Sequence, residues 1–202
     1  MSRMSPADRR AAIVTATVAV AVRKGLASTT VRDVAMEMGT SSGLIHHYFD
    51  SMDEVLAAAF ERVASADLER SRRLMAEAAS PVAALRVFFQ TYTPVDRDWS
   101  FQLWLDAWAE AARRPALREV SARLNLAWQA LLELTIRSGV SSGVFVCADP
   151  AAAAWRVLSL LDGLALQVVA HGTTIPRGAV VAWSTAEAES ELGLAPGALS
   201  SA

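Results

Sequence analysis

Apolar residues recur at helical spacing along most of the chain, and a helix-capping residue precedes nearly every apolar run. Ser5-Pro6 supplies an N-cap and a proline for the first helical position, and Gly25 ends the helix that follows. Thr30, with Asp33 three residues later, resembles a capping box and predicts a short second helix that ends at Gly39. The N-terminal part of the chain is therefore expected to be helical.

Two more helices are expected directly after these. Ser41 or Ser42 caps a third short helix that reaches about Phe49. Ser51–Glu54 forms a full capping box. The periodic pattern after this box predicts one long helix, about 52–79, that joins the two halves of the chain.

The second half repeats the same pattern and predicts an all-α protein. The Gly/Ser-rich stretch from Ser138 to Asp149 is a loop, and its apolar fragment Val144–Val146 is too short and isolated to indicate a sheet. Residues 193–202 lack periodicity and are expected to fray. Eight or nine helices are predicted in all. Those of the second half open at Ser80-Pro81, Asp98, Arg114-Pro115, Asp149-Pro150 and Ile175-Pro176.

Composition and charge exclude several classes of protein. Of 202 residues, 53% are hydrophobic and 20% charged, which is a globular balance. The apolar stretch Ala11–Val22 is too short to span a membrane, and Asp8 and Arg23-Lys24 oppose a secretory signal. A net charge of −2 excludes bulk cationic binding to nucleic acid but permits local phosphate contacts. The lone Cys147 gives no internal disulfide, so we expect a cytoplasmic protein.

The two short helices on either side of Gly39 have the arrangement of a helix-turn-helix unit, in which the second helix enters the major groove of DNA. The first is expected to bury Val31, Val34, Ala35 and Met38. In the second, Ile45 and Phe49 face inward. Its outward residues are short polar or amphipathic, which suits contacts with bases and phosphates: Ser41, Ser42, Gly43, Leu44, His46, His47 and Tyr48.

Residues 9–61 resemble the DNA-binding domain of the TetR family of bacterial repressors. Gly43-Leu-Ile-His-His-Tyr-Phe49 is most similar to the choline-responsive repressors of betaine synthesis, and Asp162-Gly163-Leu164 resembles their ligand-binding domain. The pattern has no gaps and is therefore more specific than a lone helix-turn-helix. It runs through Arg9-Arg10-x-x-Ile13-Val14-x-Ala16, Gly25-Leu26-x-x-Thr29-Thr30-Val31-Arg32-Asp33-Val34-Ala35, Gly39-Thr40-Ser41-Ser42-Gly43 and His47-Tyr48-Phe49-x-Ser51-x-x-Glu54-Val55-Leu56.

The resemblance implies roles for particular residues on DNA. Thr30 and Tyr48 match positions that hold phosphates, and Arg32 matches one that reaches a base or a phosphate. The chain departs from the family at two positions, because His46 replaces a frequent tyrosine and Met52 replaces a lysine. Without that lysine, phosphate binding is expected to depend more on Arg32, Arg9, Arg10 and the dipole of the long helix. Groove contacts are implied for Ser42, Gly43, Leu44, His46 and His47.

The resemblance also implies a ligand-controlled repressor with two domains. Residues 5–51 would form the DNA-binding domain and residues 52–192 a helical domain for ligand binding and dimerisation. A homodimer would bind a palindromic operator, and a small-molecule effector would tilt the connecting helix and so release the DNA. The dimer interface is expected on the helices 150–171 and 176–191, through Trp155, Leu158, Leu161, Leu164, Ala165, Val168, Val169, Val180, Val181 and Trp183, although these residues would also suit an intrachain core.

Aromatic residues are concentrated in the central helices of the second half. An aromatic stripe is more often core than pocket, but the family binds its effectors among these helices. We expect a largely apolar or cationic effector, with a bulky hydrophobic compound favoured over choline. Asp106, Gln102, Glu110 and Asn125 are the nearby polar groups. The expected ligand-binding residues are Phe88, Tyr92, Trp104, Trp108 and Trp128.

No residue pattern indicates an enzyme, a cofactor or a metal site. His46 and His47 are adjacent and diverge on a helix, so they do not chelate one ion easily. Cys147 lies near no obvious base, and no nucleophile or phosphate-loop motif is present in the sequence. The alternative function is an all-α small-molecule-binding protein or enzyme that uses the aromatic cluster, but it leaves the first fifty residues unexplained.

Overall fold

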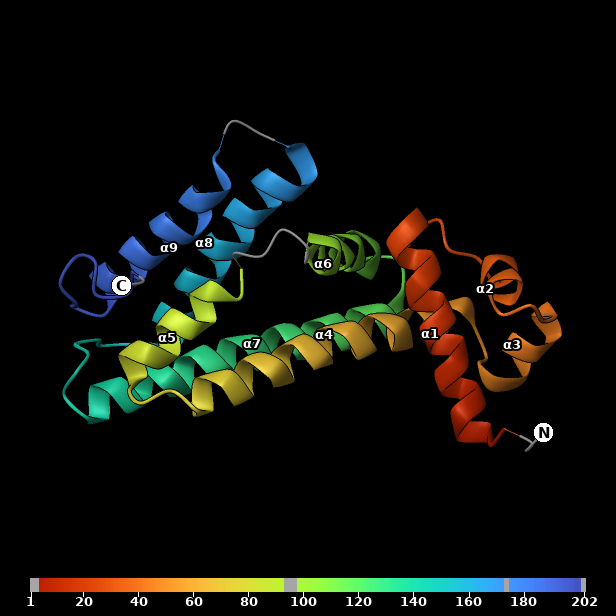
Figure 1. Ribbon diagram of the computed structural model, residues 1–202, viewed down its shortest axis with the longest axis horizontal. Coiled ribbons are helices and arrows are strands. Elements are labelled where there is room, and N and C mark those ends of the chain that lie inside the picture. The colour runs from red at the N-terminus through yellow and green to blue at the C-terminus, as the bar shows by residue number, and fades with distance from the viewer. Residues whose placement is uncertain (1–3, 93–97, 173–174, 201–202) are drawn as a thin grey trace. The chain divides into compact units, whose positions relative to one another are not determined.

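The computed structural model describes residues 4–92, 98–172 and 175–200, and within these residues it contains nine α-helices and no strand (Figure 1). The predicted all-α fold is confirmed. The helices are α1 (Pro6–Lys24), α2 (Val31–Glu37), α3 (Ser42–Tyr48), α4 (Met52–Ala76), α5 (Pro81–Gln90), α6 (Asp98–Ala111), α7 (Pro115–Ser141), α8 (Pro150–His171) and α9 (Arg177–Glu191).

Most helices begin where a capping residue predicted a start. The side chains of Ser5, Thr30, Ser80 and Asp149 each accept a backbone N–H from the first turn of their helix. Ser51 accepts the N–H of Glu54 in the same way. The predicted ends are less accurate, because α4 ends at Ala76, α7 continues to Ser141 into the predicted loop, and α9 begins one residue after Pro176.

The chain divides into two compact units, and the division differs from the predicted boundary at residue 51. Unit 1 comprises Met1–Ala66 and Trp99–Leu124, and unit 2 comprises Asp67–Asp98 and Asn125–Ala202. The three boundaries therefore fall inside α4, after the first residue of α6 and inside α7. Nearly all of α6 belongs to the same unit as the helix-turn-helix.

Unit 1 is built around the apolar faces of its N-terminal helices. The cores of α1, α2 and α3 meet in one cluster that includes Ile13, Val34, Ile45, Phe49 and Val55. Gly39, between α2 and α3, has a φ of +62°, in the left-handed region that glycine adopts without strain. This turn lets the two short helices pack on α1 together.

Unit 2 contains α8 and α9, which lie side by side (Figure 1), and a packed C-terminal segment. The carboxylate of Glu189 accepts backbone N–H groups from Gly197 at 2.8 Å and Leu199 at 2.6 Å. The guanidinium of Arg86 in α5 donates two hydrogen bonds to the carbonyl oxygen of Ala198. The expectation of a frayed tail is therefore wrong for residues 193–200, because two charged side chains satisfy its backbone and Leu199 is buried. Residues 201–202 lie outside the described residues.

Candidate functional site

The candidate DNA-reading helix is α3, which is fixed to the rest of unit 1 by its apolar side. Ile45 is 1% exposed, and Phe49 directly after the helix is 2% exposed. In α2, Val34 and Ala35 are buried as predicted, and the partly buried Val31 and Met38 pack against the same cluster. The remaining residues of α3 therefore present an outward surface on a well-packed base.

The nine predicted DNA-contact residues lie on two adjoining segments, the N-terminus of α2 and the whole of α3 with its N-cap. Five polar or charged members are exposed to solvent, as is Gly43, while three are half-buried. The exposed residues are Thr30, Arg32, Ser41, Gly43, His46 and His47, and the half-buried ones are Ser42, Leu44 and Tyr48. Their burial is compatible with the predicted contacts.

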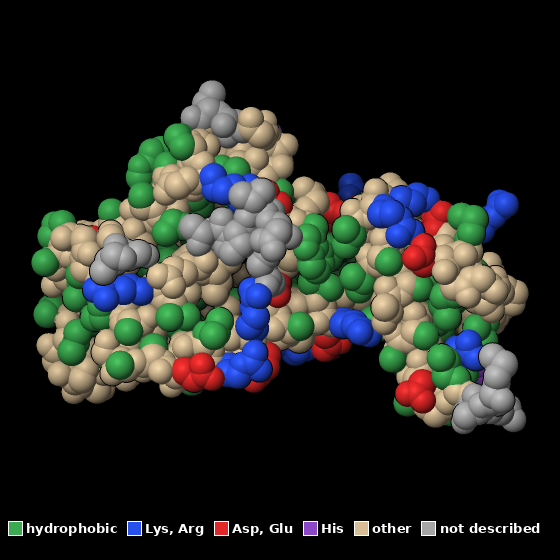
Figure 2. Space-filling model, in the orientation of Figure 1, with side chains coloured by type: hydrophobic (Ala, Val, Ile, Leu, Met, Phe, Trp, Pro, Cys, Tyr) green, Lys and Arg blue, Asp and Glu red, His purple; other side chains and the backbone are tan. Residues whose placement is uncertain are grey.

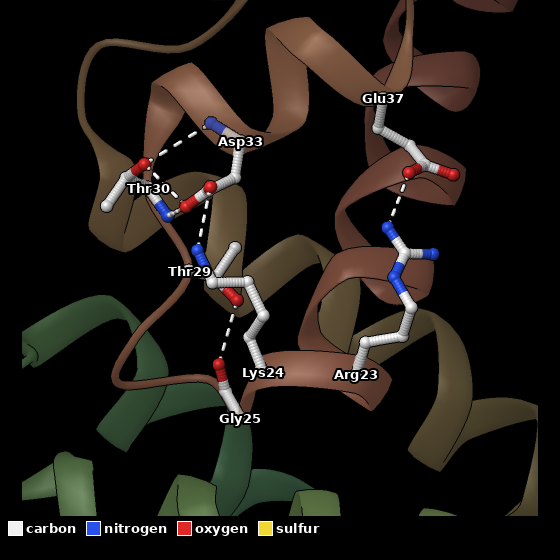
Figure 3. A network of polar contacts seen from close by, with 7 residues as sticks. All are labelled: Arg23, Lys24, Gly25, Thr29, Thr30, Asp33 and Glu37. Carbon is white, nitrogen blue, oxygen red and sulfur yellow. Dashed lines mark hydrogen bonds and ion pairs between the residues drawn. The ribbon is translucent and has the colours of Figure 1, made fainter.

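A network of polar contacts holds the N-terminus of α2 against the end of α1. Figure 3 shows Lys24 and Thr30 both directed at the carboxylate of Asp33. The hydrogen bond from Lys24, followed by those from Thr30, lowers the pKa of Asp33 to about 2. Arg23 pairs with Glu37 at the other end of α2. The position of Thr30 is thus set by hydrogen bonds to the carboxylate of Asp33, which stays ionised at neutral pH.

Met52, which replaces a frequent lysine of the family, has a structural role in this chain. It is partly buried and packs against the core cluster of the helix-turn-helix. The side chain therefore stabilises the junction between α3 and α4 through apolar contact. Arg10, for which a phosphate contact is expected, lies with its guanidinium against the end of α3.

Two of the acidic residues expected near a ligand are already bound to other parts of unit 1. Asp106 in α6 accepts the backbone N–H of Leu26 at 2.8 Å and the side-chain amide of Gln102 at 3.0 Å. Glu110 pairs with Arg114 at 2.9 Å. Both carboxylates are therefore poor candidates for the counter-charge of an effector.

The five predicted ligand-binding aromatics belong to two separate clusters. In unit 1, Trp104 lies edge-on to Phe60 of α4 at 4.8 Å between ring centroids and packs on Trp108 at 5.5 Å. In unit 2, Phe88 contacts Tyr92 at 5.6 Å and Trp128 at 6.1 Å. Trp104 holds α6 on α4 through its contact with Phe60. Its exposure of 8% equals that of Trp128, and Phe88 is fully buried, so burial alone does not distinguish the two clusters.

The cluster in unit 2 adjoins an acidic group that the aromatic pattern did not reveal. Burial raises the pKa of Asp162 in α8 to about 7. Burial, and then the charges of Asp162 and Asp67, raise the pKa of Tyr92 well above its usual value. The two carboxylates therefore act electrostatically on the same phenol. Among the described basic side chains, none forms an ion pair with Asp162.

The predicted dimer-interface residues do not all reach the surface of the chain. Leu158, Leu161, Ala165 and Val180 are buried within the single chain, so they belong to the intrachain core. Leu164, Val168, Val169 and Val181 are half-buried. Trp155 and Trp183 are 37% and 52% exposed. The predicted interface is thus wrong for these four residues. In the sequence, an apolar residue that faces the intrachain core looks the same as one that faces a partner chain.

α8 is apolar over most of its length, while only part of it is buried. Its mean hydropathy reaches 1.4 over an 18-residue window, of which 33% is buried, so among the described residues α8 and not Ala11–Val22 is the segment whose length and composition would allow a membrane span. Figure 2 shows hydrophobic side chains at the surface formed by α8 and α9. A surface of this kind is typical of a contact with another protein.

Known proteins resemble the chain in sequence over both of its parts. Residues 13–59 match the family of bacterial regulatory proteins of the tetR type, and residues 81–193 match the C-terminal domain of BetI-type transcriptional repressors. The HTH-type transcriptional regulator BetI of Paraburkholderia xenovorans is 33% identical over 182 residues, which cover 81% of this chain and 83% of that protein. BetI of Paraburkholderia phytofirmans is 32% identical over 177 residues, with the same two shares.

Solved structures show the same fold. A transcriptional regulator of Pseudomonas aeruginosa PAO1 superposes with a TM-score of 0.79 at 26% identity, covering 93% of this chain and 92% of that one. A regulator of Saccharomonospora viridis, solved in complex with choline, superposes with a TM-score of 0.79 at 24% identity, covering 89% and 94%.

The all-helical fold, with a helix-turn-helix in its first unit, defines a helix-turn-helix transcriptional regulator. The chain belongs to the TetR family and carries a C-terminal domain of the BetI repressor type. Its relatives are transcriptional regulators, which supports a regulatory function over the enzymatic alternative.

Proposed function

We propose that the chain is a homodimeric repressor in the cytoplasm that binds a palindromic operator through α3 and releases it when a small organic cation binds in unit 2. The observation that carries the DNA-binding part is the exposed polar surface of α3, with His46 and His47 outward and Ile45 anchored in the core. A helix held in this way inserts into the major groove as a rigid element.

The two-fold assembly uses the outer sides of α8 and α9. Small residues allow helices of two copies to approach closely, while the two exposed tryptophans supply apolar area. A two-fold axis places two copies of α3 on half-sites about one turn of DNA apart, roughly 34–36 Å. The exposed residues available to this interface are Trp155, Ser159 and Gly163 in α8, and Gly178, Ala182, Trp183 and Ala186 in α9.

The effector is a small organic cation because the unit 2 cluster combines a partly buried acid with aromatic faces. Desolvation makes the ionised form of Asp162 costly, and a cation beside it recovers that cost. The rings of Phe88, Tyr92 and Trp128 offer apolar contact and attract positive charge. Choline, which the Saccharomonospora viridis regulator binds, is a compound of this class and serves as the probe.

Operator binding is tested with DNA from upstream of the chain's own gene in a gel-shift assay. The wild-type chain is expected to retard this DNA in preference to a shuffled duplex, and added choline is expected to release it. Equal affinity for both duplexes contradicts the repressor function, whereas specific DNA binding without any effect of choline contradicts only the effector.

The effector class is tested by comparing choline with 3,3-dimethylbutan-1-ol, in which carbon replaces the quaternary nitrogen. Calorimetry is expected to show binding of choline and at least about tenfold weaker binding of the neutral compound. Asp162→Asn and Trp128→Phe are expected to weaken choline binding. Trp108→Phe, which changes the cluster of unit 1, is the matched control and is expected to leave it unchanged. Equal binding of both compounds to the wild-type chain contradicts a cationic effector.

A further inference from the structure

The reading helix α3 has few internal means of holding its own position. It is seven residues long, its N-cap Ser41 forms no side-chain hydrogen bond with the first turn, and Ile45 is its one buried residue. It also contains Gly43, which lowers helix stability. Helices this short are unstable in isolation, so contacts from other elements must fix the orientation of α3.

Arg10 of α1 supplies such a contact at the C-terminal end of α3. Its Nη1 donates a hydrogen bond to the carbonyl oxygen of Tyr48 at 2.7 Å. The same guanidinium lies 3.8 Å from the centroid of the Phe49 ring. Tyr48 is the last residue of α3 and Phe49 its C-cap. One side chain therefore binds both the final carbonyl of the helix and the ring that anchors its end.

The chemistry of arginine suits this position. The last carbonyl groups of a helix have no partner within the helix, and a cation there also interacts favourably with the helix dipole. A planar guanidinium can stack on an aromatic ring while an edge N–H donates to an oxygen, whereas a lysine ammonium lacks this planar geometry. The contact of Arg10 with Tyr48 and Phe49 combines both interactions.

We propose that Arg10 is a positioning residue that sets the orientation of α3 and thereby the discrimination between operator and other DNA. This role differs from the phosphate contact expected for Arg10 from the sequence. It rests on the proposed reading of DNA by α3. A tilt of α3 displaces His46 and His47 from the base edges, while contacts with the DNA backbone by other residues persist.

The experiment compares two variants of Arg10 on two duplexes. Arg10→Lys keeps the charge but removes the planar group, and Arg10→Met removes both. Fluorescence anisotropy measures the affinity of the full-length chain for the upstream DNA and for a shuffled duplex, over a series of salt concentrations. Thermal melts identify a temperature at which each variant is fully folded, and binding is measured there. Arg72→Lys and Arg72→Met, at an exposed arginine of α4 that pairs with Glu69 of the same helix, are the matched controls.

A positioning role predicts that the ratio of specific to non-specific affinity falls at least about tenfold in both Arg10 variants, with non-specific affinity unchanged. A direct bond to phosphate predicts instead that Arg10→Lys binds almost normally. In that case Arg10→Met lowers both affinities together. The slope of log K against the logarithm of the salt concentration becomes less negative by about 0.9 for each phosphate that the variant no longer neutralises. That result overturns the proposal, as does wild-type discrimination by both variants once they are folded.

The outcome also separates this proposal from the one on which it rests. If the wild-type chain itself does not discriminate the upstream DNA from the shuffled duplex, the proposed function fails. If the wild-type chain and the Arg72 variants discriminate and Arg10→Lys does so equally well, only the role of Arg10 fails.

Discussion

The carboxylate of Asp106 in α6 accepts the backbone N–H of Leu26, 80 residues earlier in the chain, at 2.8 Å. Leu26 is fully buried and lies in the loop between α1 and α2, the loop that leads to the exposed Thr30. A second carboxylate, Asp53 at the start of α4, accepts the N–H of Ala116 in α7 at 3.0 Å. These bonds attach α6 to the loop before α2 and the start of α7 to the start of α4, in agreement with their place in unit 1.

Asp106→Ala is expected to destabilise the fold and loosen the loop before α2. The buried N–H of Leu26 loses its acceptor, which costs about 1–3 kcal/mol. Asp106→Asn retains a carbonyl oxygen that can accept the same bond, and its cost is expected to be smaller. Urea unfolding measures the free energy of unfolding of both variants. Gln102→Ala is the control, because it removes one hydrogen bond to Asp106 and leaves the bond from the Leu26 N–H in place. Equal stability of Asp106→Ala and the wild-type chain would show that water replaces the acceptor.

Arg32→Ala is expected to weaken operator binding, and its salt dependence distinguishes two contacts. If Arg32 reads a base, the affinity falls by about 1–3 kcal/mol for the operator alone. If it holds a phosphate, affinity falls on every duplex and the salt dependence flattens. His47→Ala is compared in the same anisotropy titration. Wild-type binding by both variants contradicts the assigned orientation of α3.

The sequence predicted the helices of this fold well because their boundaries depend on local chemistry. Ser5-Pro6, the capping box of Thr30 and Asp33, and Ser80-Pro81 act within one turn, so their effect can be seen in the chain itself. The segment 193–200 was misjudged for the opposite reason. Its order comes from Glu189 and from Arg86, which is 112 residues away from its acceptor.

The candidate sites were predictable only where they depend on one helix. The outward-facing residues of α3, which are the candidate DNA contacts, follow from the helical period around Ile45. The effector cluster requires knowing that Phe88 meets Trp128 and that Trp104 meets Phe60, and neither pairing has a signal in the spacing. The burial of Asp162 has no local signal either, because a single acid in an apolar helix is equally compatible with an exposed position.

Trp183→Glu is expected to dissociate the dimer. The tryptophan is 52% exposed in the single chain, and a charge at the centre of an apolar interface is costly to bury. Sedimentation equilibrium at micromolar concentration is expected to give a dimer for the wild-type chain and a monomer for the variant. Met36→Glu, on an exposed apolar residue of α2, is the control and is expected to remain dimeric. A wild-type monomer contradicts both the interface and the palindromic operator.

Choline binding is expected to strengthen as the pH rises through the pKa of Asp162, about 7. A cation binds the ionised carboxylate, whose population rises roughly tenfold between about pH 6 and pH 8 when the pKa is near neutral. Binding therefore releases a proton, and the calorimetric enthalpy is expected to vary with the ionisation heat of the buffer. Asp162→Asn removes this pH dependence. A flat pH profile in the wild-type chain indicates a different counter-charge.

The same carboxyl is expected to make stability depend on pH in the absence of effector. Its folded pKa of about 7 lies above the value of 3.8 for an unburied aspartate, so the folded chain retains a proton that the unfolded chain releases. This contribution to stability is full below the unfolded pKa and is lost as the pH rises toward 7. Relative to Asp162→Asn, the wild-type chain is expected to lose on the order of 4 kcal/mol between about pH 4 and pH 8, because each unit of pKa difference corresponds to about 1.4 kcal/mol. Denaturant unfolding at each pH measures the difference.

Gly43→Ala is expected to stabilise the free protein and weaken its complex with DNA. A Cβ at Gly43 has as its nearest neighbour the hydroxyl of Ser41 at 3.8 Å, an ordinary contact, and the backbone there is helical. Replacing glycine by alanine inside a helix gains about 0.5–1 kcal/mol, which denaturant unfolding can detect. In the operator complex the added methyl group separates the helix backbone from the groove, so anisotropy is expected to show weaker binding. Gly139→Ala is the contrasting variant, because its Cβ would lie 2.0 Å from the ring of Phe145 and destabilise the fold. A Gly43→Ala variant that is more stable and binds the operator as well as the wild-type chain would show that α3 does not approach DNA at this residue.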